Sequence, residues 1–396
     1  MSNPTLNDDG DQFDVRRLLT DERSRGIVLQ LAVLLAVALV IAFITANTLA
    51  NLQRAGLASG FGFLTDTAFF DINQKLIDYT SQSTFGRALV VGFLNTILVS
   101  AMGIVTATLI GFTAGVLRLS RNWIISRAVT AYVEFTRNVP VLLQIIFWWA
   151  TLTALPKVRD SLSIGDAAYL NNRGMRLPAP ILEAGMEWVF AAVFLGIVAA
   201  IILSRWARKR QEQTGQTFPS GWAGLGLIIG LPLIVYYILG QPLEWDVPVR
   251  KRFNFDGGFN VTPELIALWL ALSTYTGAFI SEIVRSGILS VSRGQTEAAF
   301  ALGLRPNQTM RLVIIPQALR VIIPPLTSQY LNLTKNSSLA IAIGYQDLVS
   351  IGGTILNQSG QALEVVGIWM AVYLSLSLLT SAYMNWYNKR IALVER

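Results

Sequence analysis

The sequence predicts an all-α polytopic membrane protein with about eight transmembrane helices. Of its 396 residues, 53% are hydrophobic and only 14% are charged, and the mean hydropathy is +0.50. A water-soluble globule of this size normally carries more charge. Eight apolar runs reach the roughly 17 or more residues that a membrane helix needs. These runs are 27–46, 88–117, 128–155, 188–204, 222–239, 264–286, 313–335 and 364–384.

The distribution of Lys and Arg predicts that both termini are cytoplasmic. The segments 1–26, 118–127, 205–221, 287–312 and 385–396 carry 17 of these residues, whereas the loops 47–87, 156–187, 240–263 and 336–363 carry 10. Basic residues favour the cytoplasmic side, although Arg250-Lys251-Arg252 argues weakly against this orientation. No small-residue cleavage site follows the first apolar run. We therefore predict that this run is a retained helix and not a signal peptide.

Composition also narrows the chemistry. The chain has no histidine and no cysteine, which argues against common zinc sites, iron–sulfur clusters, thiol nucleophiles, Ser-His-Asp triads and disulfides. The net charge of +7 is spread over short loops, so it indicates membrane topology, and no nucleic-acid partner is expected. We predict neither catalytic residues nor a metal site.

Two glycine pairs indicate places where helices approach closely. Gly111 and Gly115 lie in the second segment, and Gly226 and Gly230 lie in the fifth. Small residues four apart let membrane helices pack closely. The loops on the outer side are long and contain turn signals and aromatic residues, so they either dock an external partner or cap the helices.

Proline interrupts the third segment at Pro140. Proline inside a helix removes a backbone hydrogen bond, so we expect an interfacial helix over 123–138 and a crossing helix that starts near Pro140. The crossing helix contains Gln144 and Trp148. We assign both residues to a hypothetical translocation path.

The seventh segment is predicted to be kinked or broken by Pro316 and by Pro324-Pro325, and to be broken in its outer half by the polar run 335–338. A broken helix at membrane depth needs protein or a water-filled cavity around it. We therefore place the rest of the hypothetical path beside four polar residues, Asn332, Lys335, Asn336 and Ser337. The alternative is a helix that simply ends at the membrane surface.

Four charges lie within or at the edge of apolar segments, as the i,i+3 pairs Glu134 with Arg137 and Glu282 with Arg285. Pairing one turn apart lowers the cost of placing a charge in a membrane. These residues either contact a solute or gate its path, or they sit at the cytoplasmic edge and position helices. We favour the structural role.

A short helix is predicted over 293–302, between two crossing segments. Ser292 with Gln295 is a capping-box pattern, Gly303 suits a left-handed C-terminal position, and Pro306 prevents continuation. At about ten residues it is too short to span, so it should lie along the cytoplasmic surface. We predict that it contacts another protein through Arg293, Glu297, Ala298, Ala299 and Arg305.

The run Glu297-Ala298-Ala299, then Gly303 and, further on, Val313 to Pro316 resembles the E-A-A-x-x-x-G…I-x-L-P loop of permease subunits of ATP-binding-cassette importers. The stretches 134–144 and 335–340 resemble signatures of polar amino-acid permeases. The overall length is similar to that of the larger permeases in the general L-amino-acid systems of Gram-negative bacteria.

The resemblance implies a type I importer permease of the inner membrane, with a five-helix core and a cytoplasmic coupling helix. In such a permease Glu297 and Gly303 would act in coupling to the ATPases and not in catalysis. It implies these divisions: tail 1–26, extra helix and periplasmic loop 27–84, core 85–155, insertion 156–263 with two helices, core 264–390 with coupling loop 287–312, and tail 391–396. It further implies a second homologous permease subunit, two cytoplasmic ATPase subunits and a periplasmic amino-acid-binding protein as partners.

ATP and Mg would be bound by those ATPases, because this chain has no G-x-x-x-x-G-K-[ST] motif and needs no cofactor of its own. Besides its protein partners, the chain would contact membrane lipid. Two alternatives remain open: a stand-alone amino-acid carrier driven by Na⁺ or H⁺, and a membrane scaffold that moves no solute.

Overall fold

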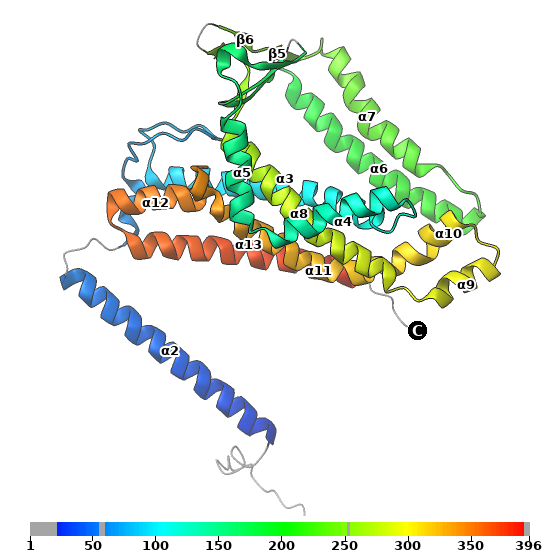
Figure 1. Cartoon of the computed structure of the whole chain (residues 1–396), viewed down its shortest axis with the longest axis horizontal. Helices are drawn as coiled ribbons and strands as arrows, with labels where there is room; N and C mark the ends of the chain where they lie inside the picture. The colour runs from blue at the N-terminus through cyan, green and yellow to red at the C-terminus, as the bar shows by residue number, and fades with distance from the viewer. Residues whose placement is uncertain (1–21, 55–59, 166, 252–253, 392–396) are drawn as a thin grey trace, which may run out of the picture.

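The computed structural model describes residues 22–54, 60–165, 167–251 and 254–391, so most of the predicted N-terminal tail and C-terminal tail lies outside the described residues. The described chain is mainly helical (Figure 1). Its α-helices are α2 Glu22–Arg54, α3 Phe85–Leu117, α4 Trp123–Asn138, α5 Val141–Thr153, α6 Met186–Thr214, α7 Ser220–Ile238, α8 Pro263–Leu289, α9 Arg293–Ala301, α10 Pro306–Thr309, α11 Ile315–Asn336, α12 Leu348–Ser359 and α13 Ala362–Ile391.

Among the described residues, seven helical stretches are long and apolar enough to cross a membrane. Helix α5, with 13 residues, is apolar but shorter. The eight predicted segments therefore correspond to these seven stretches and α5. The fold class predicted from composition is confirmed.

The third segment is divided at Pro140, as predicted. Helix α4 ends before this residue, and Pro140 is the N-cap of α5. The break leaves carbonyl groups without helical partners. Gln144 Nε2 donates to two of them, the oxygens of Thr136 and Val139, at 2.9 and 3.0 Å. The side chain of Gln144 thus holds the junction between the two helices.

Of the kink or break predicted at Pro324-Pro325, a break is excluded, because α11 runs through both prolines. Membrane helices tolerate proline where neighbouring elements hold the helix, and Ile322, Ile323 and Leu326 around these prolines are buried. The helix changes near the predicted polar run instead, where α11 gives way to the 3-10 helix Ser337–Ile343. A π-helical turn, Met310–Ile314, precedes α11.

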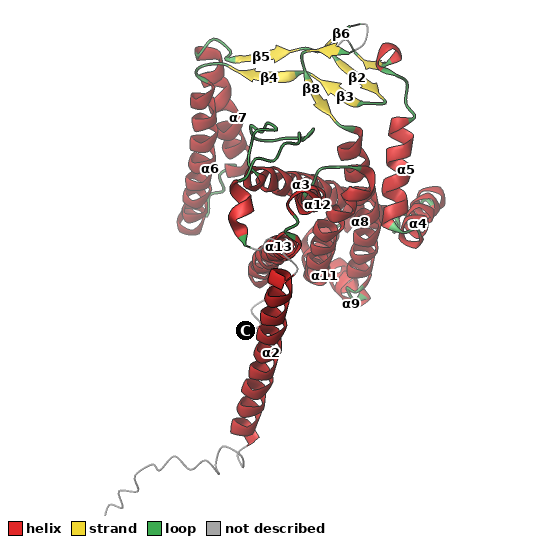
Figure 2. Cartoon of the chain, turned by 90° about the vertical axis from the view of Figure 1, so that its left-hand side faces the viewer, coloured by secondary structure: helices red, strands yellow, loops and turns green. Residues whose placement is uncertain are grey.

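Short strands, which the sequence analysis did not predict, fill the loops on either side of the α6–α7 pair. They are β1 Leu162–Ile164, β2 Ala168–Asn171, β3 Gly174–Leu177, β4 Ala179–Leu182, β5 Leu243–Asp246, β6 Val249–Arg250, β7 Phe255–Asp256 and β8 Phe259–Val261. One sheet has the order β1-β2-β3-β8, and β4 pairs with β5 and β6 with β7. The antiparallel pairing of β3 with β8 joins the loop before α6 to the loop after α7. Figure 2 shows these strands together at one end of the molecule.

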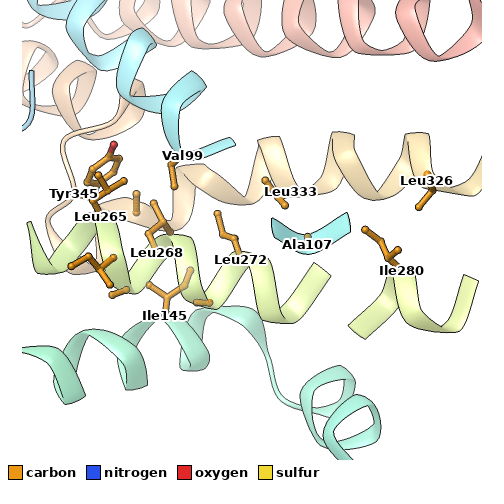
Figure 3. Packing of buried hydrophobic residues seen from close by; sticks show 14 of the residues in the cluster. Val99, Ala107, Ile145, Leu265, Leu268, Leu272, Ile280, Leu326, Leu333 and Tyr345 are labelled. Carbon is orange, nitrogen blue, oxygen red and sulfur yellow. The ribbon is translucent and has the colours of Figure 1, made fainter. Parts of the chain in front are cut away.

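Helix α8 lies at the centre of the larger hydrophobic core, packed by α3, α5 and α11. Figure 3 shows Leu268 and Leu272 of α8 between Leu333 of α11 and Ile145 of α5. All four side chains are fully buried. A second core joins the segment before α3 to α12 and α13.

The predicted close packing at Gly111 and Gly115 is confirmed at the α3–α8 contact. A Cβ atom at Gly111 would lie 2.4 Å from Ile280 Cγ2, and one at Gly115 would lie 2.7 Å from Val284 Cβ. Neither position has room for any side chain.

The corresponding prediction for Gly226 and Gly230 of α7 is wrong, because a Cβ at either position would meet no atom within 4 Å. Helices α6 and α7 instead approach at Gly196, where an added Cβ would lie 2.7 Å from the carbonyl oxygen of Leu227. Spacing alone does not show which face of a helix is covered.

Candidate functional site

The surface helix α9 forms where the sequence predicts it. Gly303 follows it with a φ of 77°, as expected for a left-handed residue. The Gly303 N–H donates to the carbonyl of Phe300 at 2.9 Å, and the Leu304 N–H donates to that of Ala299 at 3.1 Å. These two bonds are those of a Schellman motif, which terminates a helix sharply.

The predicted capping box at the start of α9 is not formed. Ser292 is the N-cap, but its side chain makes no capping hydrogen bond. Gln295 instead accepts a hydrogen bond from Gln317 of α11, with 3.2 Å between Nε2 and Oε1. A glutamine pair thus ties the start of α9 to the start of α11.

The exposed face of α9 is partly apolar. Glu297 and Ala298 are exposed, whereas Ala299, also assigned to the predicted contact, is only 3% exposed and faces the protein. Phe300 and Leu302, which the sequence analysis did not single out, are 48% and 82% exposed. Apolar side chains this exposed next to a helix end are a typical anchor for another protein.

Arg293 and Arg305 lie at either end of α9, and both are exposed. They frame the apolar side chains with positive charge. The exposed surface of α9 therefore combines two apolar side chains with the charges of Arg293, Glu297 and Arg305.

A cluster of five charged side chains joins the end of α3 to α4 and α8. Arg118, the residue after α3, forms an ion pair with Glu282 and lies 3.7 Å from Glu134. Glu282 also lies 3.7 Å from Arg137 and 3.2 Å from Arg285. The carboxylate of Glu282 therefore pairs with three guanidinium groups at once.

The predicted pairing of Glu282 with Arg285 along α8 is present. Glu134 and Arg137, in contrast, are each paired across helices in the described structure. Arg118 pairs with both carboxylates of the cluster, and its side chain is only 6% exposed. The sequence analysis counted Arg118 merely as a loop cation.

A cavity of about 240 Å³ opens between α8 and α11. It is lined by Tyr275, Thr276, Phe279, Gln329, Asn332 and Asn336. The residues from α8 lie halfway along that helix, and none of the six carries a formal charge. The lining therefore offers amide and hydroxyl groups for hydrogen bonding together with two aromatic rings.

The residues assigned to the hypothetical path separate into two groups. Asn332 and Asn336 line the cavity, and the exposed Lys335 lies between them in the sequence. Ser337 is buried and donates to the carbonyl of Thr334 at 2.7 Å, while Trp148 packs against the main core. Neither Ser337 nor Trp148 is among the residues that line the cavity.

The chain itself connects the surface helix to the cavity. Helix α8 supplies one wall and leads directly into α9, and α10 and the π-helical turn then lead into α11, the other wall. Helix α9 therefore lies, along the chain, between the two helices that line the cavity. In the described part of the chain, no group of three or more Asp or Glu side chains is placed to hold a metal ion.

The sequence of the chain is similar to those of known membrane transport proteins. The family model for "Binding-protein-dependent transport system inner membrane component" matches residues 192–393, about half of the chain. The chain is 55% identical to the general L-amino acid transport system permease protein AapQ of Rhizobium johnstonii, over 98% of this chain and 97% of that protein.

It is 51% identical to the putative amino-acid ABC transporter permease protein YhdX of Escherichia coli, over 94% of this chain and 95% of that protein. It is 43% identical to the glutamate/glutamine/aspartate/asparagine transport system permease protein BztB of Rhodobacter capsulatus, over 97% of each chain. The chain therefore belongs to the family of inner-membrane components of binding-protein-dependent transport systems.

Proposed function

We propose that this chain is the permease subunit of an ATP-driven importer that moves L-amino acids across the bacterial inner membrane. The observation that carries the proposal is the position of α9, an exposed helix that joins the two helices lining the cavity. The relatives of the chain are named as amino-acid permeases, which supports L-amino acids as the substrate class.

In this proposal α9 is a coupling helix that docks into a cytoplasmic ATPase subunit. Phe300 and Leu302 enter an apolar groove, while Arg293, Glu297 and Arg305 fix the orientation. When the two ATPases close on ATP, they pull α9, and α8 and α11 move with it. The cavity then changes from facing the cytoplasm to facing the periplasm.

The orientation and partners follow from the same proposal. Helix α9 and both termini lie in the cytoplasm, and the strands lie on the periplasmic side. A second homologous permease completes the membrane unit, two ATPases bind ATP and Mg, and a periplasmic amino-acid-binding protein delivers substrate. In this assignment the chain itself carries no catalytic residue, and ATP hydrolysis occurs in the partner chains.

The cavity supports a small polar substrate. Asn332, Asn336 and Gln329 present amide groups that can donate to a carboxylate and accept from an ammonium group. Because the lining is uncharged, it is suited to the zwitterionic part that all L-amino acids share. We propose that this cavity is a point on the translocation path.

Uptake into proteoliposomes tests the function. The full complex, co-purified in mild detergent, is reconstituted with and without internal ATP, and accumulation of radiolabelled L-glutamate and L-leucine is measured. We expect uptake that needs ATP and the binding protein and that survives collapse of Na⁺ and H⁺ gradients. Uptake by this chain alone that stops when the Na⁺ and H⁺ gradients are collapsed would identify an ion-coupled carrier instead.

A further inference from the structure

One face of α6 combines cations with a groove. The groove measures about 570 Å³ and is lined by Ile201, Ser204, Arg205, Arg208, Lys209 and Glu212. These positions recur every three or four residues, so they lie on one side of the helix. With three cations and one carboxylate, the groove carries a net positive charge.

Although Glu212 lines the same groove, it forms no ion pair with the three cations in the described part of the chain. None of the ion pairs in the described part of the chain involves Arg205, Arg208 or Lys209. The neighbouring Arg210 is engaged elsewhere, since it stacks on Trp206 at 5.4 Å and donates to Gln216 at 2.9 Å. Three guanidinium or ammonium groups are thus available to an external anion.

The position of the groove along α6 shows at which depth of the membrane such an anion would bind. From Glu187 to Arg205, α6 rises about 27 Å at 1.5 Å per residue, close to the roughly 30 Å hydrocarbon thickness. Arg205 to Glu212 therefore lie at the level of lipid headgroups. Trp206 and Trp222, which are 49% and 80% exposed, mark the same level, as aromatic residues do at membrane interfaces.

An apolar stripe leads from the groove toward the bilayer centre. Phe190, Phe194, Val198 and Ile201 follow one another at helical spacing, and all four are exposed. Figures 1 and 2 show α6 and α7 standing beside the main bundle, with the strands at one end of the pair. A lipid in this place would have its acyl chain on the stripe and its headgroup in the groove.

We propose that this face of α6 binds an anionic phospholipid, with its phosphate held by Arg205, Arg208 and Lys209. The Ser204 hydroxyl can donate a further hydrogen bond to the phosphate. Glu212 lies one turn beyond the other polar groups, at the outer end of the groove. At this end, Glu212 does not occupy the place of the phosphate between the three cations, and its negative charge disfavours binding of a second anion beside it.

Native mass spectrometry of the complex tests this site. The full-length chain, with the subunits that co-purify, is titrated with phosphatidylglycerol and separately with phosphatidylcholine. For the R208Q/K209Q variant we expect phosphatidylglycerol affinity to fall about 25-fold, at about fivefold per cation, with phosphatidylcholine unaffected. The swap R208K/K209R keeps both charges and should retain binding within about threefold.

A matched control removes one Lys and one Arg at the end of α13, as K389Q/R390Q. Arg390 there stacks on Trp386 at 4.2 Å, and neither cation belongs to the groove. This variant should keep the affinity. Equal losses in both variants would show a general charge effect, and equal binding of both lipids to the unmodified protein would also overturn the proposal.

Cross-linking then distinguishes a lipid from a protein partner on this face. A photoactivatable phosphatidylglycerol analogue is incorporated into membranes containing the complex, and labelled peptides are mapped. We expect label within 194–212 that unlabelled phosphatidylglycerol removes and inorganic phosphate does not. Cross-links from this segment to another subunit, with no lipid label, would assign the face to that subunit.

Discussion

The guanidinium group of Arg137 lies over the ring of Phe279, with its Cζ 5.3 Å from the ring centroid. Phe279 also lines the cavity, and Arg137 also lies 3.7 Å from Glu282. One aromatic ring therefore separates the charge cluster from the cavity. Helix α8 carries both Phe279 of the cavity and Glu282 of the cluster. A rotation of α8 that opens the cavity would therefore also disturb the cluster.

Removing Arg118 should destabilise the protein. The substitution Arg118→Met leaves Glu282 without its closest partner while keeping much of the buried volume. Because a partly buried charge that loses a partner is costly, we expect a loss of about 1–3 kcal/mol, seen as a lower Tm in detergent.

The control for Arg118 is Glu134→Gln. The side chain of Glu134 is 55% exposed and lies 3.7 Å from Arg118, so its pair should contribute no more than about 1 kcal/mol. If both variants melt at the same temperature as the unmodified protein, the cluster does not hold α3, α4 and α8 together.

Gly303 should be essential for coupling and unimportant for the stability of the bundle. In Gly303→Val, the side chain has space, because no atom lies within 4 Å of a Cβ, but the positive φ is strained by about 1–2 kcal/mol. We expect the end of α9 to shift and ATP-driven uptake to fall at least about tenfold, with little change in the Tm of the core.

Gly294→Ala provides the comparison within the same helix. Gly294 also has free space around it but does not have a positive φ, so alanine should be tolerated or should strengthen α9. Normal coupled uptake in Gly303→Val would contradict the assignment of α9 as the coupling helix.

The contact between α3 and α8 should tolerate no added side chain. Gly111→Ala places a methyl group 2.4 Å from Ile280 Cγ2 and 3.0 Å from the carbonyl oxygen of Gly277. Overpacking of this kind costs about 1–3 kcal/mol, so the Tm should fall. Gly226→Ala on α7 meets no atom and should leave the Tm unchanged or raise it. A loss of Tm in Gly226→Ala but not in Gly111→Ala would show that the packed face is the one at Gly226 and not the one at Gly111.

The features that were predictable from the sequence have local causes. Pro140 divides a helix because it lacks an N–H, and Gly303 ends one because only glycine adopts a positive φ without strain. Both effects act within a few residues. The apolar runs are likewise local, and they gave the number and approximate bounds of the long helices.

The features that were missed depend on distant segments. Strands β3 and β8 pair residues that lie more than 80 positions apart, such as Leu177 with Phe259. In the sequence Arg118 is an ordinary loop cation, and only the fold shows that α8 places Glu282 beside it. The tolerance of α11 for Pro324 depends on its buried neighbours, which one sequence does not show.

The buried carboxyl group of Asp347 should make stability depend on pH. It lies outside the long apolar helices, is fully buried at the start of α12, and accepts a hydrogen bond from the Ser350 N–H at 2.8 Å. Burial raises the pKa of Asp347 from 3.8 to about 7, against the opposing effect of the backbone N–H groups of Ser350 and Val349.

A folded-state pKa above the unfolded value means that the folded protein binds the proton more tightly. The stabilisation is therefore complete below about pH 4 and is lost as the pH rises to about 7. We expect the Tm of the unmodified protein to fall as the pH rises through this window.

Asp347→Asn keeps an acceptor for the Ser350 N–H and does not titrate, so its Tm should lose this dependence and exceed that of the unmodified protein at pH 8. Asp71→Asn, at an exposed carboxyl group, serves as the control and should change neither the Tm nor its slope with pH. A slope with pH that persists unchanged in Asp347→Asn would assign the dependence to other groups.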